Sequence, residues 1–280
     1  MLTVIEVVRK TSEFFASKGI ESPRLNAELL LGHALGLARM RLYLEFERPV
    51  SQAELATVRE LVRRRGRREP IQYILGFTDF HGLRLKTDRR ALIPRPETEF
   101  LVETVVARCG SPRRILDLGT GCGAIALALA SAFPEASVTA VDASAEALSL
   151  AAENAQATGL AARVALVESD WFSGLPAGEP FDLVVANPPY LTEAEAAASP
   201  PEVREHEPAL ALASGYDGFS DTGRIVSGSA GAIATGGMLA LETGTGHHAR
   251  LVESARAAGF SRTESLRDLA GRDRFFLAWR

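Results

Sequence analysis

The sequence predicts an α/β fold, in which a doubly wound, mostly parallel sheet of seven strands follows a small all-α bundle and a β-hairpin. Three observations support this prediction. Capped helical patterns fill the first part of the chain, two glycines then interrupt short alternating segments, and strand-like runs alternate with helical patterns from residue 93 onward. Strands separated by helices pair in parallel through right-handed crossovers. We therefore expect a helical bundle over residues 1–71, a hairpin linker over residues 72–92, and an α/β domain over residues 93–280.

Capping residues mark the helices of the bundle. Ser22 precedes Pro23, which suits an N-cap followed by proline at the first helical position, and a later glycine ends the apolar stripe. The string "SQAE" at residues 51–54 has the spacing of a capping box, and apolar residues then recur at helical intervals. After the bundle, Gly76 and Gly82 separate short alternating segments, which predicts the hairpin.

The strands and helices of the α/β part follow from the alternation of their patterns. We expect strands at residues 114–118, 137–142, 163–168, 183–186, 237–242, 261–266 and 274–279. We expect helices at residues 125–133, 145–158 and 247–258. The stretch 194–201 is rich in small residues and predicts a loop.

Charges are distributed unevenly along the chain, whose net charge is −4. Residues 1–100 carry 18 Lys and Arg against 13 Asp and Glu, whereas residues 101–280 carry 13 against 22. All three lysines lie in the first part, which excludes a P-loop lysine or a Schiff-base lysine from the second. Six of the arginines crowd residues 59–68, where they form either a solvated helix face or a docking surface.

The composition predicts a globular protein of the cytoplasm without a bound metal. Hydrophobic residues make up 46% of the chain, which is enough to fill a core. The longest apolar run falls far short of the roughly 20 residues of a membrane-spanning helix. Glu6 and Arg9 interrupt the stretch in which a signal peptide would be apolar. The two cysteines form no metal-binding pattern, and the adjacent His247 and His248 are a poor ligand pair.

The string "DLGTGCGAIALALA" at residues 117–130 places a glycine-rich loop between a strand and a helix. Its glycines let a ligand approach the backbone closely, and the helix that follows offers unpaired N–H groups at its start. Asp142 ends the next strand, where a carboxylate can bind the two hydroxyls of a ribose. The same pattern fits the fingerprint of NAD-binding domains, so the loop and Asp142 alone favour S-adenosylmethionine and NAD about equally.

Two further features favour S-adenosylmethionine. Asp117 precedes the glycines and could hold the cationic amino group of a bound amino acid, whereas it would repel a pyrophosphate. Asp170 and Trp171 follow the third strand and offer an acceptor and an aromatic face for an adenine amine and ring. The alternative interpretation is that Trp171 belongs to the core and Asp170 caps a helix.

The string "NPPY" at residues 187–190 directly follows the fourth predicted strand. Methyl transfer from a sulfonium is an in-line displacement, and an amide nitrogen is a poor nucleophile that must be held in line with the methyl group. The Asn187 side chain and the Pro188 carbonyl can pair with a planar amide, and neither Pro188 nor Pro189 has an N–H that would compete. Tyr190 can cover the face of that amide. A simple proline turn would explain the two prolines but not the residues that flank them.

The motifs resemble those of a known family. "NPPY" after "FDLVVA", with "DLGTGCGAIALALA" upstream, is similar to class I S-adenosylmethionine-dependent amino-methyltransferases. The strings "IPRPETEFLVE", "SDWF", "EPALAL", "DGF" and "DLAGRDRF", together with "EPIQYILG" near the end of the bundle, resemble the peptide chain release factor glutamine methyltransferases. The resemblance covers most of the chain and implies a Rossmann-like methyltransferase sheet.

The resemblance also implies a reaction, which is methylation of the side-chain amide nitrogen of the glutamine in the Gly-Gly-Gln motif of class 1 release factors. It gives the bundle a role in binding the release factor, and we expect a monomer with no stable nucleic acid partner and no membrane attachment. The expected cofactor-binding residues are Asp117, Gly119, Thr120, Gly121, Cys122, Gly123, Asp142, Asp170, Trp171 and Asn187. The expected catalytic and substrate-binding residues are Asn187, Pro188, Pro189 and Tyr190. The family usually has a glutamine near "LETG", where this chain has His247.

Three other functions fit parts of the sequence. One is a cofactor-binding protein without turnover that uses the bundle as an interaction module, although nothing in the sequence looks disabled. An adenine amino-methyltransferase acting on nucleic acid would use a similar asparagine, but the acidic second part and the lack of a separate target-recognition segment disfavour it. An NAD-dependent oxidoreductase would use the glycine loop, but no evident Tyr/Lys or His/Asp pair could handle a hydride.

Overall fold

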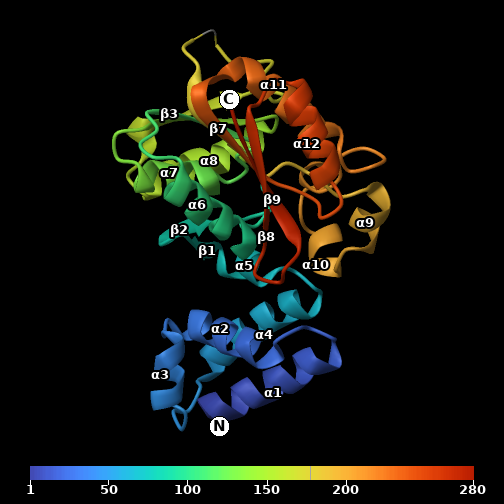
Figure 1. Cartoon of the computed structure of the whole chain (residues 1–280). Helices are drawn as coiled ribbons and strands as arrows, with labels where there is room; N and C mark the ends of the chain where they lie inside the picture. The colour runs from blue at the N-terminus through green and yellow to red at the C-terminus, as the bar shows by residue number, and fades with distance from the viewer. Residues whose placement is uncertain (177) are drawn as a thin grey trace. The chain divides into compact units, whose positions relative to one another are not determined.

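The computed structural model of the chain describes residues 1–176 and 178–280 and divides into two compact units (Figure 1). The first unit comprises Met1–Gly76 and Pro200–His206, and the second comprises Phe77–Ser199 and Glu207–Arg280. The short segment Pro200–His206 therefore belongs with the N-terminal helices, although it lies far along the chain. None of the helices in the described residues is long and apolar enough to cross a membrane.

The named elements of the first unit are all helices. Its helices are α1 (Val4–Ser17), α2 (Pro23–Leu35), α3 (Arg39–Leu44), α4 (Gln52–Gly66), α5 (Ile71–Leu75) and α10 (Pro201–Arg204). Buried residues of α1, α2 and α4, among them Phe15, Leu30 and Leu61, form its core. The helix α5 occupies the beginning of the predicted hairpin linker, where the alternation was expected to start.

The two predicted helix starts in the bundle have different outcomes. At α4 the capping box is present, because the Ser51 backbone N–H donates to the Glu54 carboxylate (2.8 Å) and the Glu54 N–H donates to the Ser51 hydroxyl (3.3 Å). At α2 the prediction of a Ser22 side-chain cap is wrong. Ser22 is in the left-handed conformation (φ 47°) rather than the extended one that an N-cap needs, and its carbonyl accepts from the Asn26 side chain instead (3.1 Å).

The arginines of residues 59–68 do not form a single solvated face. Arg65 is only 6% exposed, and its guanidinium donates to Glu202 of α10 (2.9 Å) and to the side chain of Asn26 (2.8 Å). Arg68 donates to the second carboxylate oxygen of the same Glu202 (2.8 Å). Two arginines thus hold one glutamate, which explains why the segment Pro200–His206 joins the first unit.

The second unit is built around a sheet of seven strands, in the spatial order β5-β4-β3-β6-β7-β9-β8. The strands are β3 (Arg114–Leu118), β4 (Ser137–Asp142), β5 (Val164–Glu168), β6 (Phe181–Ala186), β7 (Ile233–Glu242), β8 (Arg262–Arg267) and β9 (Asp273–Trp279). All pairs are parallel except those of β9, which runs antiparallel to β7 and β8. The hairpin β1 (Phe77–Phe80) and β2 (Leu83–Lys86) forms a separate sheet. The predicted fold class is confirmed.

Helices cover both faces of the sheet (Figure 1). The helices α6 (Pro96–Arg108), α7 (Ala124–Ala132) and α8 (Ala145–Ala157) cover one face, and α11 (Ser220–Ala232) and α12 (His248–Ala257) cover the other. Successive strand residues serve opposite faces, since Ile115 packs with the first group of helices and Leu116 with the second. This double covering explains why apolar residues face both sides of the central strands, as in the run Leu183–Ala186 of β6.

The predicted loop at residues 194–201 is wrong, because most of it is the short helix α9 (Glu193–Ala198). Its start is a capping box, in which the Thr192 N–H donates to Glu195 (2.9 Å) and the Glu195 N–H donates to the Thr192 hydroxyl (3.1 Å). The run of alanines after this box favours a helix.

Candidate active site

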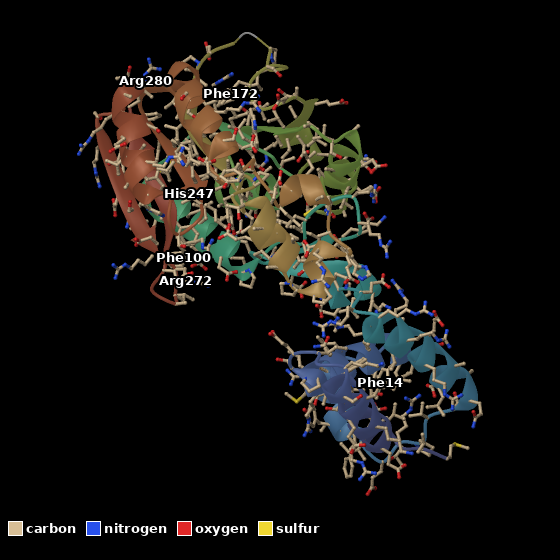
Figure 2. The ribbon with its side chains drawn as sticks, turned by 90° about the vertical axis from the view of Figure 1, so that its right-hand side faces the viewer. Phe14, Phe100, Phe172, His247, Arg272 and Arg280 are labelled. Atoms are coloured by element: carbon tan, nitrogen blue, oxygen red, sulfur yellow. The ribbon has the colours of Figure 1, made fainter. Side chains whose placement is uncertain are left out.

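The predicted site residues follow the carboxyl ends of the central strands. The strands β3 and β6 are neighbours, and the chain continues from β3 toward β4 on one side and from β6 toward β7 on the other. Ligands bind at such a switch point in doubly wound sheets. The glycine loop follows β3, and Asn187 follows β6. Figure 2 shows Arg272 and Arg280 at opposite ends of β9, and the Arg272 end is the one at which these parallel strands finish.

The glycine loop is held in shape from the neighbouring strand. Gly119, Gly121 and Gly123 have positive φ values of 72°, 56° and 87°. Residues that carry a side chain rarely adopt such a backbone conformation. The Gly121 N–H donates to one carboxylate oxygen of Asp142 (2.8 Å), and the Ser144 N–H donates to the other (2.9 Å). Each of these oxygens keeps a lone pair, so Asp142 can shape the loop and still accept from a ligand hydroxyl.

Asp117 is fully buried beneath the loop. One carboxylate oxygen accepts from the Thr120 hydroxyl (2.6 Å) and from the Ala126 N–H (3.1 Å). The other oxygen, Oδ1, is buried with no hydrogen-bond partner among the described residues. Burial raises the pKa of Asp117 to about 7, and the nearby Asp142 contributes to the rise. The buried Oδ1, which has no hydrogen-bond partner among the described residues, suits a cationic ligand group.

Two residues of the predicted cofactor-binding set turn their side chains inward. The Thr120 hydroxyl is committed to Asp117, and Thr120 itself is buried. Cys122 is buried as well, and burial raises the pKa of its thiol to about 12. These residues can offer a ligand their backbone, while their side chains support the loop.

Trp171 and Asp170 have different environments. The Trp171 ring lies against the glycine loop, since a methyl group on Gly119 would come within 3.3 Å of it. Its indole N–H donates to Asp221 (3.0 Å), and its backbone is in the left-handed conformation (φ 53°). The Asp170 carboxylate is largely exposed and pairs with Arg224 of α11 (2.7 Å). The structure thus brings Trp171 to the loop and engages Asp170 in a surface ion pair.

A buried hydrogen-bond network joins both polar flanks of the Pro188-Pro189 turn. The Asn187 side-chain N–H donates to the Thr98 hydroxyl (3.1 Å), and the Thr98 hydroxyl donates to one oxygen of Glu242 (2.7 Å). The Tyr190 hydroxyl donates to the other oxygen of Glu242 (3.1 Å). Thr98 lies on α6 and Glu242 ends β7, so three elements meet at this network.

Burial dominates the electrostatics of the network. It raises the pKa of Glu242, against the hydrogen bonds from Thr98 and Tyr190, which lower it. Burial and the neighbouring Glu242 also raise the pKa of the Tyr190 phenol, which therefore stays protonated. The Arg274 guanidinium lies 5.3 Å from the centre of the Tyr190 ring, in the geometry of a cation–π contact.

Sequence reasoning did not single out Thr98 or Glu242. The start of α6 carries a recognisable signal, with Pro96 at a first-turn position and the acidic Glu97 and Glu99 after it. Glu242 carries a weaker one, because it is an acidic residue at the end of a long apolar strand. Neither signal indicates that the two side chains meet.

His247 immediately precedes α12. Its ring packs edge-on against Phe219, with ring centres 5.5 Å apart, and its Nδ1 lies 3.4 Å from the Thr243 hydroxyl. Burial lowers the pKa of His247 below the ordinary histidine value. The imidazole, which packs against Phe219, is therefore neutral at neutral pH.

Comparisons with known proteins agree with this architecture. A model of the PrmC N-terminal domain matches residues 6–76, and a model of the methyltransferase small domain matches residues 96–200. The release factor glutamine methyltransferase of Rhodopirellula baltica is 40% identical over 97% of this chain and 94% of its own length. That of Chlorobaculum tepidum is 46% identical over 86% of this chain and 85% of its own length.

Among solved structures, the catalytic domain of hMettl16, in complex with the MAT2A 3'UTR hairpin 6, has a TM-score of 0.58. The match covers 79% of this chain and 81% of that chain, at 20% sequence identity. At this level of identity the likeness is one of fold alone.

Proposed function

Because this chain belongs to the family of release factor glutamine methyltransferases, we propose that it transfers a methyl group from S-adenosylmethionine to a release factor. The acceptor is the side-chain amide nitrogen of the glutamine in the Gly-Gly-Gln motif of class 1 peptide chain release factors. The observation that carries this proposal is the position of Asn187. It follows β6 at the switch point, next to the strand whose end carries the glycine loop.

The residues at the carboxyl ends of β3, β4 and β5 fit the cofactor. The orphaned Oδ1 of Asp117 suits its cationic amino group, and Asp142 suits its ribose hydroxyls. The Trp171 ring, which lies against the loop, offers an apolar surface for the adenine. When bound, S-adenosylmethionine supplies an electrophilic methyl group on a sulfonium.

The residues of the turn fit the substrate amide. One Asn187 side-chain N–H is used by Thr98, so the other N–H and the oxygen remain for the substrate carbonyl and N–H. The Pro188 carbonyl accepts the second substrate N–H, and Tyr190 covers the amide face. These contacts hold the nitrogen in line with the methyl group, which is the main requirement of the displacement. An N–C bond forms as the S–C bond breaks, and one amide proton is released.

Methyl transfer to a purified release factor tests the proposal directly. Incubation with cofactor labelled in the methyl group should label the release factor, and peptide mapping should place the label on the motif glutamine. A release factor in which alanine replaces that glutamine is the control and should remain unlabelled. Label on an adenine-containing oligonucleotide instead would favour the nucleic acid methyltransferase.

We propose that the first unit binds the release factor and that the enzyme acts as a cytoplasmic monomer, without stable nucleic acid or membrane attachment. An apolar groove of about 330 Å³ in this unit is lined by Val7, Phe14 and Val62, with Lys10, Arg59 and Arg63 among its other residues. Arg65 is buried and ion-paired with Glu202, so it is a structural residue and not a candidate for this contact. The positive charge suits an acidic partner surface.

Charge reversal at the groove tests this role of the first unit. Arg59→Glu with Arg63→Glu should raise the KM for the release factor about tenfold at low ionic strength and less at high salt. The Kd for S-adenosylmethionine should stay unchanged. Arg41→Glu with Arg67→Glu makes the same change of charge at two other exposed arginines and is the matched control. Equal KM values for the two double variants at low salt would refute the proposal that this groove binds the release factor.

Asp117 should make cofactor binding dependent on pH. Because the pKa of Asp117 is raised to about 7, the carboxyl is largely neutral below that pH and ionised above it. A cationic ligand group binds the ionised form better, so the affinity should increase as the pH rises through about 7. Calorimetric titration with S-adenosylmethionine between about pH 6 and about pH 8 measures this. The Asp117→Asn variant should bind weakly with a flatter profile; a wild-type affinity independent of pH would contradict the assignment.

Gly218 should be required for the shape of the catalytic turn. Its φ is +69°, and a methyl group there would overlap the carbonyl oxygen of Tyr190. Gly218→Ala should therefore displace Tyr190 and lower kcat about a hundredfold, as a displacement of about 1 Å does. Gly215→Ala is the matched control, because Gly215 has a similar φ of +65° but its nearest neighbour, Ser220, leaves 3.6 Å. Similar kcat values for the two variants, measured by methyl transfer, would count against this role of the turn.

A further inference from the structure

The network around Glu242 has a defined hydrogen-bond direction. Thr98 has one hydroxyl hydrogen, and it donates this hydrogen to one carboxyl oxygen of Glu242, 2.7 Å away. The Tyr190 hydroxyl is directed at the other oxygen of the same carboxylate (3.1 Å). With its hydrogen committed to Glu242, the Thr98 oxygen has only lone pairs to offer to Asn187.

This direction determines the orientation of the Asn187 amide. The nitrogen and oxygen of an amide are nearly equal in size, so shape alone would allow either to face Thr98. An acceptor at Thr98 selects the NH2 group, which lies 3.1 Å from the hydroxyl oxygen. The Asn187 oxygen is then left for the substrate. In the reversed orientation an N–H would face the substrate N–H, and two donors do not pair.

The hydrogen-bond network around Glu242 is better explained by a role in the active site than by a contribution to the stability of the fold. Glu242 is buried with 2% of its surface exposed, and Thr98 is buried with 4% exposed. A buried carboxyl group loses its solvation by water, and apolar residues of similar volume often stabilise a core at least as well. The two oxygens of Glu242 nevertheless accept from the Thr98 and Tyr190 hydroxyls, which serve the two flanks of the Pro188-Pro189 turn.

We propose that Glu242, acting through Thr98, is a positioning residue that sets the orientation of the Asn187 amide and so presents the Asn187 oxygen to the substrate. Through its second oxygen, the same carboxylate holds the Tyr190 hydroxyl at the other flank of the turn. The inference rests on the proposed function, in which Asn187 binds the substrate amide.

Two variants of Thr98 separate the hydroxyl from the shape of the side chain. Thr98→Val keeps the branched shape but removes the hydroxyl, and Thr98→Ser keeps the hydroxyl. Thr98→Val should lower kcat about a hundredfold, with the Kd for S-adenosylmethionine within about twofold of wild type. Thr98→Ser should restore most of this loss. Glu242→Gln should also lower kcat strongly, because its NH2 group can donate to Thr98 and release the Thr98 hydrogen toward Asn187.

A measurement without substrate tests the orientation by itself. The side-chain NH2 signal of Asn187 in 15N-labelled protein is identified by its loss in Asn187→Asp. One of its two hydrogens should exchange slowly with solvent in the wild type and in Thr98→Ser, and quickly in Thr98→Val. Unchanged exchange in Thr98→Val, or wild-type kcat in that variant, would overturn the inference. If the wild type fails to methylate the release factor, the proposed function fails, while the exchange data still decide the orientation.

Discussion

Replacement of Asn187 by alanine should remove nearly all methyl transfer, with kcat lower by about 10²–10³, the range found when one donor to a developing charge is lost. The reason is geometric. The variant loses the oxygen and the N–H that would pair with the substrate amide, while the Pro188 carbonyl remains. Rates with saturating release factor and labelled cofactor measure the change.

The cofactor affinity of the same variant is the control. The contacts of the glycine loop with Asp142 and of Asp117 with Thr120 do not involve Asn187, so the Kd for S-adenosylmethionine should rise little. A turnover number equal to that of the wild type would discard the amide pairing. A loss of affinity as large as the loss of rate would instead make Asn187 chiefly a cofactor ligand.

Replacement of Asp142 by alanine should have the opposite pattern. The variant loses the acceptor for the Gly121 N–H and the acceptor for the Ser144 N–H, in addition to any contact with the ribose. Hydrogen bonds to charged groups contribute about 1.5–3 kcal/mol each, so the Kd for S-adenosylmethionine should rise about a hundredfold. At saturating cofactor, kcat should remain close to that of the wild type, because the substrate contacts are intact.

Asp142→Asn is the graded control for this prediction. It keeps one acceptor oxygen and the size of the side chain but loses the charge and the second acceptor. Its affinity for the cofactor, measured by calorimetry, should lie between those of the wild type and Asp142→Ala. A Kd close to that of the wild type in both variants would show that the loop binds the cofactor without Asp142.

The sheet was predictable because its signals are local. Most of the strands are rich in apolar residues, and the helices between them have their own period, so seven strands and a mostly parallel order follow from neighbouring residues. The glycine loop was predictable for the same reason, since Gly119, Gly121 and Gly123 lie within five residues between a strand and a helix. Helices α6 and α11 were not predicted, although Pro96 marks the start of the first.

The rest depends on pairs that are distant in sequence. Thr98 and Glu242 are 144 residues apart, and Arg65 and Glu202 are 137 apart. No pattern in a single sequence specifies such pairs, because the patterns report periodicity and capping within one element. Asp170 illustrates the same limit, because its carboxylate pairs with Arg224, which lies 54 residues further along the chain.

Because Arg65 and Arg68 share Glu202, the N-terminal helices depend on a segment from much later in the chain. The polypeptide passes between the two units three times, after Gly76, after Ser199 and after His206. A fragment that ends at Gly76 therefore lacks a piece of its own fold and keeps the nearly buried Arg65 guanidinium without its carboxylate counter-ion. The N-terminal helices are thus not a detachable module, and an autonomous version would need residues 200–206 grafted back through an artificial connection.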